Sequence, residues 1–342
     1  MFELKLKIQQ LLIHRKIRRN QEKVTTQVID SNPASAIFLS VLKLLVLCFF
    51  GVLILFPFFF MISISLMTDD EVANLSTNFR FVSDFTEGNT YYQGTKGIGD
   101  TVAWSKVVAN TYHRALATGY WNSLGFTALN VIISVVLKVF ITFLMGYAFA
   151  LKKWHGKGLV WFLALALLVL PEVALLSGQY IVVFRTNMRA NYTGLLFAIA
   201  LPFVSSIFNT VMYKNSFEAI PGRIKEVSLI DGAGGIKYMF KIAFPMVMPT
   251  TLTIVILTSL ASWNAYLWPS ILVSDRNSLQ LLSVWLFNAG MDFSDDNSAG
   301  VPLQNIKMAA AIFVILPMFI IYLLLRKRIM NAISRQGSTI KG

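Results

Sequence analysis

Long apolar segments, separated by short polar ones, make up most of this chain. Six of them run for 18 to 31 residues, at 37–66, 121–151, 158–181, 193–213, 247–273 and 308–325. A helix needs about 20 apolar residues to cross a bilayer core that is about 30 Å thick. As helices these segments would satisfy their own backbone hydrogen bonds, as lipid requires. The pattern predicts an all-α integral membrane protein with six transmembrane helices.

Composition supports the membrane class. The chain is 56% hydrophobic and only 14% charged, with a mean hydropathy of +0.62, whereas a soluble domain carries roughly a quarter charged residues. Cys48 is the single cysteine, which excludes a disulfide within the chain and a metal site built from cysteines. There is no G-x-x-x-x-G-K-[ST] phosphate loop and no polar segment long enough for a nucleotide-hydrolysing domain. The sequence therefore predicts that no nucleotide-hydrolysing domain lies within the chain.

The formal net charge of +13 is distributed by segment. Lysine and arginine gather in the N-terminal tail, in the link 152–157, in the segment 214–245 and at the C-terminus, while the other links carry acidic clusters. By the positive-inside rule both termini are then cytoplasmic. The link 182–192, which carries Arg185 and Arg189, is the exception. We interpret the basic balance as a topology signal and expect no nucleic-acid binding.

These boundaries divide the chain into five parts. We predict a basic cytoplasmic tail at 1–35, a first span at 36–67, an extracytoplasmic loop at 68–118, a transmembrane core at 119–330 that includes the loop 214–249, and a cytoplasmic tail at 331–342. The tail 1–35 mixes basic and apolar residues at helical spacing, so it either lies on the anionic inner leaflet or is a solvated tail.

Of the charged residues inside predicted spans, two are of particular interest. Lys138 is within VVLKVFITF, and Glu172 follows Pro171 within VLPEVALL. Because such charges are costly in lipid, they are candidates for function, and an ion-coupled carrier would use them. The alternative is structural: Glu172 lies near a broken helix that faces a wet cavity, and Lys138 snorkels or faces the bundle.

The segment 216–249 is polar and glycine-containing, between two apolar spans. Pro221 suits the first turn of a helix, and Ile224, Val227 and Ile230 then recur at three-residue spacing. Gly232 would end this helix in the left-handed conformation, and a second short helix follows at about 235–244. The apolar stripe either packs on its own bundle or fits a groove in a soluble partner.

Several motifs in order resemble the permeases of binding-protein-dependent ABC importers, in particular the second permease subunit of the maltose-type sugar branch. The segment IPGRIKEVSLIDGAG resembles that family's cytoplasmic "EAA" loop, with Glu226-Val227-Ser228 in place of Glu-Ala-Ala and the Asp-Gly-Ala core intact. Other segments agree: FPFFFMISISLM at 56–67, YWNSLGFTA at 120–128, WNAYLWPSIL at 263–272, KMAAAIFVILPMFIIYLLL at 307–325 and the closing GSTIKG. The resemblance covers residues 40–75 and 118–342.

The resemblance implies a transport subunit without cofactors of its own. It implies two ATPase subunits that bind ATP and Mg, a second homologous permease, an external solute-binding protein, and a location in the bacterial plasma membrane. ATP would close the ATPase dimer and switch the bundle between inward- and outward-facing states. The expected ATPase-coupling residues are Glu226, Ser228, Asp231, Gly232, Ala233 and Gly234.

The solute path is predicted less sharply. The candidates for contact with a solute are Trp263, Asn264 and Trp268 in WNAYLWP, together with Glu172. The two tryptophans are candidates for stacking on sugar rings. The alternative for WNAYLWP is an aromatic belt before a helix-ending Pro269. Sugars, polyols, glycerophosphate-type solutes and glycan fragments all fit an importer. The competing classes are an ion-coupled carrier that uses Lys138 and Glu172, and a membrane scaffold without transport.

Overall fold

A computed structural model describes residues 33–83, 104–117, 119–151, 154–273, 279–292 and 301–338. This part of the chain is almost entirely helical, as predicted, apart from one two-residue antiparallel ladder of β1 (Met291–Asp292) and β2 (Val301–Pro302). The tail 1–32, the segment 84–103 of the predicted outer loop and residues 339–342 lie outside the described residues. Contacts divide the chain after Phe60 into two units.

The first unit is the greater part of α2 (Pro33–Ser65). Its apolar stretch Ile37–Ser65 is long enough to cross a membrane, and none of its most apolar window is buried against the rest of the chain. Its exposed side chains are mainly leucine, valine, isoleucine and phenylalanine, and they occur all around the helix. A helix that is apolar on every side requires an apolar surrounding, which lipid or another apolar helix supplies.

Two further unbroken helices are long and apolar enough to span a membrane: α5 (Tyr120–Ala150) and the Gln304–Leu324 part of α16 (Gln304–Ser338). The last helix therefore continues well beyond the predicted span 308–325, and its final residues 331–338 belong to the predicted C-terminal tail. Three bent helix pairs pass the same test of length and composition, so the described residues contain between three and six spans.

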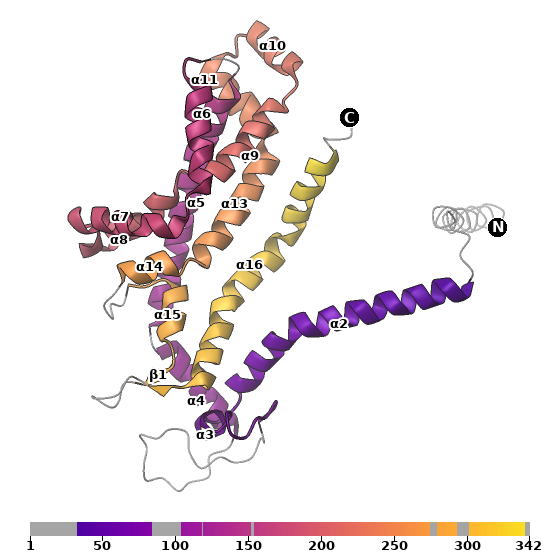
Figure 1. The fold of residues 1–342 in the computed structure, drawn as a ribbon, viewed down its shortest axis with the longest axis vertical. Helices are drawn as coiled ribbons and strands as arrows, with labels where there is room; N and C mark the ends of the chain where they lie inside the picture. Colours follow the sequence, from indigo (N-terminus) through magenta and orange to yellow (C-terminus); the bar gives the residue numbers. More distant parts are fainter. Residues whose placement is uncertain are drawn as a thin grey trace, which may run out of the picture. The chain divides into compact units, whose positions relative to one another are not determined.

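The bends correct two of the predicted spans. The segment 158–181 is not one helix, because α6 (Lys157–Ala166) and η1 (Leu167–Val169) are followed by α7 (Glu172–Arg185) at 103°. The segment 193–213 breaks in the same way: α8 (Tyr192–Ala200) and η3 (Leu201–Phe203) meet α9 (Ile207–Glu218) at 61°. In Figure 1, α7 and α8 accordingly run across the direction of α6 and α9. The predicted span 247–273 ends early, with α13 (Met248–Trp263) followed by the short α14 (Leu267–Leu272).

The core of the second unit is built by α5 packing on α9 and α13. Gly146 allows α5 and α9 to approach closely, because a Cβ built on it would overlap the Cβ of Tyr213. The Tyr213 hydroxyl donates to Thr251 Oγ1 at 3.1 Å and links α9 to α13. Small residues at such crossings let helix backbones pack where lipid offers no hydrophobic driving force.

One end of this unit carries a buried ion pair. Arg114 of α4 (Trp104–Ala117) donates to both carboxylate oxygens of Asp69 at 2.8 and 3.0 Å. Asp69 begins α3 (Asp69–Ala73) and is only 7% exposed. It also accepts a 2.6 Å hydrogen bond from Asn305 of α16. The pair thereby joins three helices that lie far apart in the sequence, at the end of the bundle opposite α10 (Figure 1).

Candidate functional site

The loop between α9 and α13 folds as the sequence predicts, into a short helix, a sharp turn and a second helix. The first helix is α10 (Gly222–Ile230), with Pro221 as its N-cap residue in the extended conformation. Pro221 thus precedes the first helical residue rather than occupying it, a difference of one position. In Figure 1, α10 stands at the end of the bundle, beside α11 (Gly235–Tyr238).

The turn after α10 is a complete glycine C-cap. Gly232 has φ +66°, which confirms its predicted left-handed conformation. Its N–H donates to the Leu229 carbonyl at 3.1 Å, and the Ala233 N–H donates to the Ser228 carbonyl at 2.7 Å. These two bonds form a Schellman motif, which satisfies carbonyl groups that the helix end would otherwise leave without partners.

The predicted coupling residues separate into a buried and an exposed group. Ser228 is 3% exposed, and its hydroxyl donates to the Lys225 carbonyl at 2.7 Å; Ala233 is also buried. Glu226, Asp231, Gly232 and Gly234 are exposed. The buried pair therefore shapes the turn, and the other four residues are accessible to solvent.

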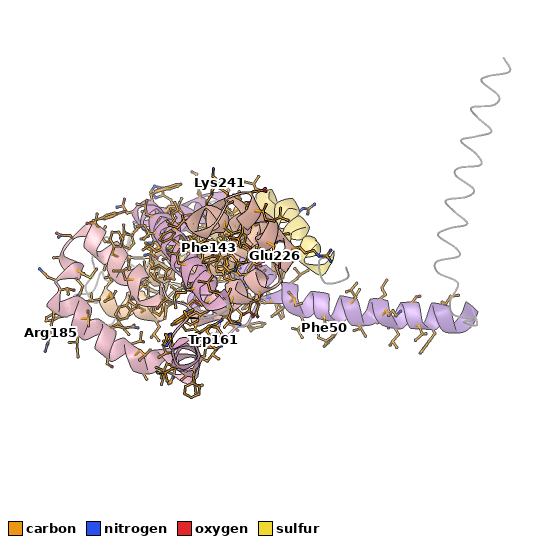
Figure 2. The ribbon with its side chains drawn as sticks, turned by 90° about the horizontal axis from the view of Figure 1, so that it is seen from above. Phe50, Phe143, Trp161, Arg185, Glu226 and Lys241 are labelled. Atoms are coloured by element: carbon orange, nitrogen blue, oxygen red, sulfur yellow. The ribbon has the colours of Figure 1, made fainter. Side chains whose placement is uncertain are left out.

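Large apolar side chains on the loop are exposed as well. Ile230 is 85% exposed and Ile236 is 74% exposed, and Val227 and Leu229 are each more than half exposed. We call these four residues the α10 apolar surface. Figure 2 views this end of the bundle and labels Glu226 and Lys241 on it. Three of them lie on α10 and Ile236 lies on α11; exposed apolar residues on short helices, with charged residues beside them, are typical of a protein–protein contact.

The second helix of the loop contains a π-helical segment. After α11 the chain forms η4 (Met239–Ala243), whose end is marked by the Phe244 N–H donating to the Met239 carbonyl five residues back. Pro245 follows within α12 (Phe244–Met246) and has no N–H for an α-helical bond to Lys241. In a regular α-helix the proline ring would also clash with the Lys241 carbonyl, and the wider π-turn gives it room. Tyr238, Met239 and Ala243 are buried in a cluster with Phe143 and Tyr213 of the bundle.

A cavity of about 310 Å³ lies deeper in the second unit, between α5, α7, α8, η3 and the α13–α14 corner. One wall is polar: Asn130, Ser134 and Lys138 follow each other at four-residue spacing on α5, so they share one helix face. The Asn130 amide donates to the Leu196 carbonyl at 3.3 Å, which fixes its orientation. Ser262 and Tyr266 add hydroxyl groups from the α13–α14 side.

The opposite wall of the cavity is apolar, formed by Val173 and Leu176 of α7, Ile199 and Ala200 of α8, and Phe203 of η3. Val173 and Leu176 reach the cavity from α7, which runs at 103° to the preceding helix. A mostly apolar cavity with a few oriented polar groups is the usual form of a small-molecule site.

The predicted solute-path residues have different positions. Trp268 lines the cavity, with its Nε1–H donating to the Ala198 carbonyl at 3.1 Å, and it is almost fully buried. Trp263 is buried in a separate cluster with Tyr120 and Trp285. Asn264 is exposed, and its amide donates to the Leu260 carbonyl. Glu172 is the first residue of α7, next to Val173 of the cavity, and its side chain lies outside the described set.

Asn130 and Ser134 were missed by the sequence reasoning, although a signal existed. Polar residues at i, i+4 and i+8 in an otherwise apolar helix indicate one polar face, and Lys138 completes that series. Within the described residues, no group of three histidine, cysteine, aspartate or glutamate side chains comes together as a metal site.

A bundle of membrane-spanning helices with an exposed helical loop and a cavity among the helices is typical of a membrane permease. Comparison with known proteins then gives the family. Residues 143–335 match the family described as binding-protein-dependent transport system inner membrane component, and the chain belongs to it. It is a permease subunit of an ABC importer, a multi-pass membrane protein that works with ATPase and solute-binding partners. As a permease it is a transport component rather than an enzyme.

Relatives support this assignment over the whole chain. A probable ABC transporter permease protein of Mycoplasma pneumoniae is 39% identical over 334 residues, covering 96% of this chain and 97% of the relative. Its Mycoplasma genitalium counterpart is 41% identical over 305 residues, with 88% and 89% covered. The sn-glycerol-3-phosphate transport system permease protein UgpE of Yersinia enterocolitica is 29% identical over 191 residues, with 56% and 64% covered.

A solved structure shares the fold. It is a chain of a bacterial ABC transporter involved in the import of the acidic polysaccharide alginate, with a TM-score of 0.62 at 19% identity, covering 88% of this chain and 99% of that one. Family membership decides between the classes that the sequence left open: an ATP-driven importer subunit is supported, rather than an ion-coupled carrier or a scaffold.

Proposed function

We propose that this permease couples to its ATPase through the α10 apolar surface. The importer would hold two ATPase subunits, which bind ATP and Mg, and a second homologous permease. The α10 loop and both termini would lie on the cytoplasmic side of the bacterial plasma membrane, as the distribution of basic residues predicts. An external binding protein would deliver the solute from the opposite side.

The observation that carries this proposal is the combination of exposure and rigidity at α10. Ile230 is 85% exposed at the end of a helix whose last turn is closed by two hydrogen bonds. Leaving a large apolar side chain in water costs about 1.5–3 kcal/mol relative to burial. A partner groove that covers Ile230 and Val227 would recover that energy, and the rigid turn lowers the entropy lost on docking.

We propose a carbohydrate or a related polar solute as the cargo. The cavity supports this, because it combines hydroxyl and amide groups on one wall with apolar side chains on the other. The related proteins support it too, since one of them is named for sn-glycerol 3-phosphate and the structural neighbour for alginate.

A photo-crosslinking experiment tests the coupling. A benzophenone amino acid at Ile230 should crosslink to the ATPase in the assembled importer, while the same group at Val182, an exposed residue of α7, should not. Ser228, although it is one of the predicted coupling residues, is a poor site for the probe because it is buried.

A substitution completes the test. Ile230→Asp should lower ATPase co-purification by about tenfold or more, because it removes apolar burial and adds a charge to the contact. Membrane levels of the permease should stay normal, since Ile230 makes little contact with the bundle. Unchanged co-purification and uptake, together with no crosslink from Ile230, would refute the proposed coupling.

A further inference from the structure

Four basic side chains accompany the α10 apolar surface. Arg223 and Lys225 lie on α10, Lys237 on α11 and Lys241 in η4, and all four are exposed. In the part of the chain that the structure describes, none of them forms an ion pair with an acid. We call these four residues the α10 cationic rim.

Acidic residues are fewer at this end of the bundle. Glu226 and Asp231 are exposed on the same loop, and Glu218 of α9 is already paired with Lys214 at 2.8 Å. Residues 232–274 contain no aspartate or glutamate. The end of α5 packs on α11 and η4, and the sequence that links α5 to α6 holds lysines but no acid. The loop therefore presents more positive than negative charge.

Cations and apolar residues are interleaved on α10. Arg223 precedes Val227 by four residues, and Lys225 precedes Leu229 by four, so each pair lies side by side along the helix. Ser228 marks the opposite face, toward the bundle, because it is 3% exposed. A partner that covers the apolar side chains of α10 therefore comes close to its two cations as well.

The groove that receives this surface needs a matching character. Apolar walls would cover Val227 and Ile230, the residues that carry the proposed coupling. A cation that loses water without an opposite charge nearby is costly, so the groups beside Arg223 and Lys225 should be carboxylates. Opposite charges on two facing surfaces also speed their encounter.

An anionic lipid surface also attracts lysine and arginine, but α10 suits it less well. In a helix that lies on a membrane, the apolar residues occupy one face and the basic residues the other. On α10, exposed Glu226 lies three residues after Arg223 and four before Ile230, so it shares their face. Anionic lipid would repel this carboxylate, whereas a protein groove can offer it a donor at one fixed position.

We infer that the ATPase groove that receives α10 is apolar at its centre and acidic at its edge, and that the α10 cationic rim steers the two subunits together. The inference rests on the coupling proposed above and specifies the surface of the partner. The two sets of residues then have different roles. The apolar side chains determine how long the complex lasts, and the cations determine how fast it forms.

Association rates test the steering. The full-length permease, assembled with its second permease in neutral-lipid nanodiscs, is immobilised, and binding of the ATPase subunit is followed by surface plasmon resonance. Salt is set at about 10 and about 150 mM, where the Debye length falls from about 30 to about 8 Å. Arg223→Glu should lower the association rate constant about tenfold at the lower salt, with a smaller difference at the higher salt. The dissociation rate constant should change by less than about threefold.

Three variants assign the effect. Arg185→Glu is the matched control, because Arg185 is an exposed arginine of α7 that lies well away from Glu226 (Figure 2) and the change in net charge is the same. It should leave both rate constants unchanged. Arg223→Lys should keep the wild-type association rate. Ile230→Ala should raise the dissociation rate constant about tenfold or more and leave association unchanged.

The chemistry of the groove is read by crosslinking. A benzophenone amino acid at Lys225 should crosslink to an ATPase peptide in which aspartate and glutamate outnumber lysine and arginine. Any other peptide, or no crosslink from Lys225, would overturn the inference.

The rate measurements can also contradict the inference. An equal loss for Arg185→Glu would show a general effect of net charge. No loss for Arg223→Glu at low salt is the result expected if the cations serve only the inner leaflet. Either result would overturn the inference and leave the Ile230 crosslink intact, whereas absence of that crosslink refutes the coupling itself.

Discussion

Replacement of Gly232 by valine isolates the contribution of the α10 turn to coupling. Gly232 has φ +66°, and a Cβ built there meets no atom within 4 Å. The penalty is therefore conformational and not steric crowding by neighbours. A residue with a Cβ in the left-handed region costs about 1–2 kcal/mol. If the whole of this free energy favours a different turn conformation, the population of the native turn falls about 5- to 30-fold.

The assay is the affinity of detergent-purified permease for its ATPase subunit, measured by titration. Gly232→Val should weaken binding by up to that factor, and solute-dependent ATP hydrolysis should fall with it. Gly232→Asn should retain most of the affinity, because asparagine tolerates the left-handed region. Gly158→Val in α6 is the matched control, since Gly158 has no positive φ and open space around its Cβ position.

The result that would refute this reasoning is unchanged affinity for Gly232→Val. Equal losses for the asparagine and valine variants would also contradict it, because the cause would then not be the backbone conformation at Gly232.

Topology and packing give three further predictions. A single cysteine at Asn89, in a chain without its native cysteine, should react with an impermeant thiol reagent in intact cells, and one at Lys225 should not; the reverse pattern would refute the topology. Gly146→Ala should lower the free energy of unfolding of the purified protein by about 1–3 kcal/mol through overpacking, and with it the Tm, while Gly125→Ala, which has open space at its Cβ position, should not. Asp69→Asn removes the carboxylate from its two-bond pair with Arg114 and should destabilise the protein by about 3 kcal/mol; an unchanged Tm would contradict a structural role for the pair.

The α10 loop was predictable because its signals are local. Pro221 before the helix and Gly232 after it mark the two ends of α10 through their own backbone preferences, which do not depend on distant contacts. The apolar stripe of Ile224, Val227 and Ile230 left open whether it packs on the bundle or faces a partner, and the structure leaves Ile230 exposed. The burial of Ser228 was not predicted, because it depends on how the loop lies against the bundle.

The two bends show what hydropathy leaves out. An apolar window reports composition and length but not the direction of the helix axis. Pro171 disfavours the helical conformation in Leu170, which has ψ 127°, and the chain turns there by 103°. At the second bend, Ser206 caps the new helix by accepting a hydrogen bond from the Asn209 N–H at 3.4 Å. Pro171 and Ser206 each interrupt an apolar segment, so the sequence alone could have indicated a helix break at both positions.

The cavity was the hardest part to predict. Its walls come from α5, α7, η3 and α13, and only the folded chain brings these segments together. Lys138 was singled out for its charge. Asn130 and Ser134, which share its wall, carry no charge and stood out less. Trp263 and Trp268 attracted attention as large aromatic residues, yet both are nearly fully buried.

The π-helical turn at Met239–Ala243 bears on how this part of the chain tolerates changes in length. Removing one residue there would return the turn to the α-helical register without rewinding its neighbours, whereas one residue lost inside a regular helix rotates everything beyond it by about 100°. The side chains of α13 that face the cavity could therefore keep their direction through a single-residue deletion in this turn. Among related permeases, single-residue gaps between the α10 loop and the following span should accordingly cluster at 239–243, and the segments on either side should keep constant length.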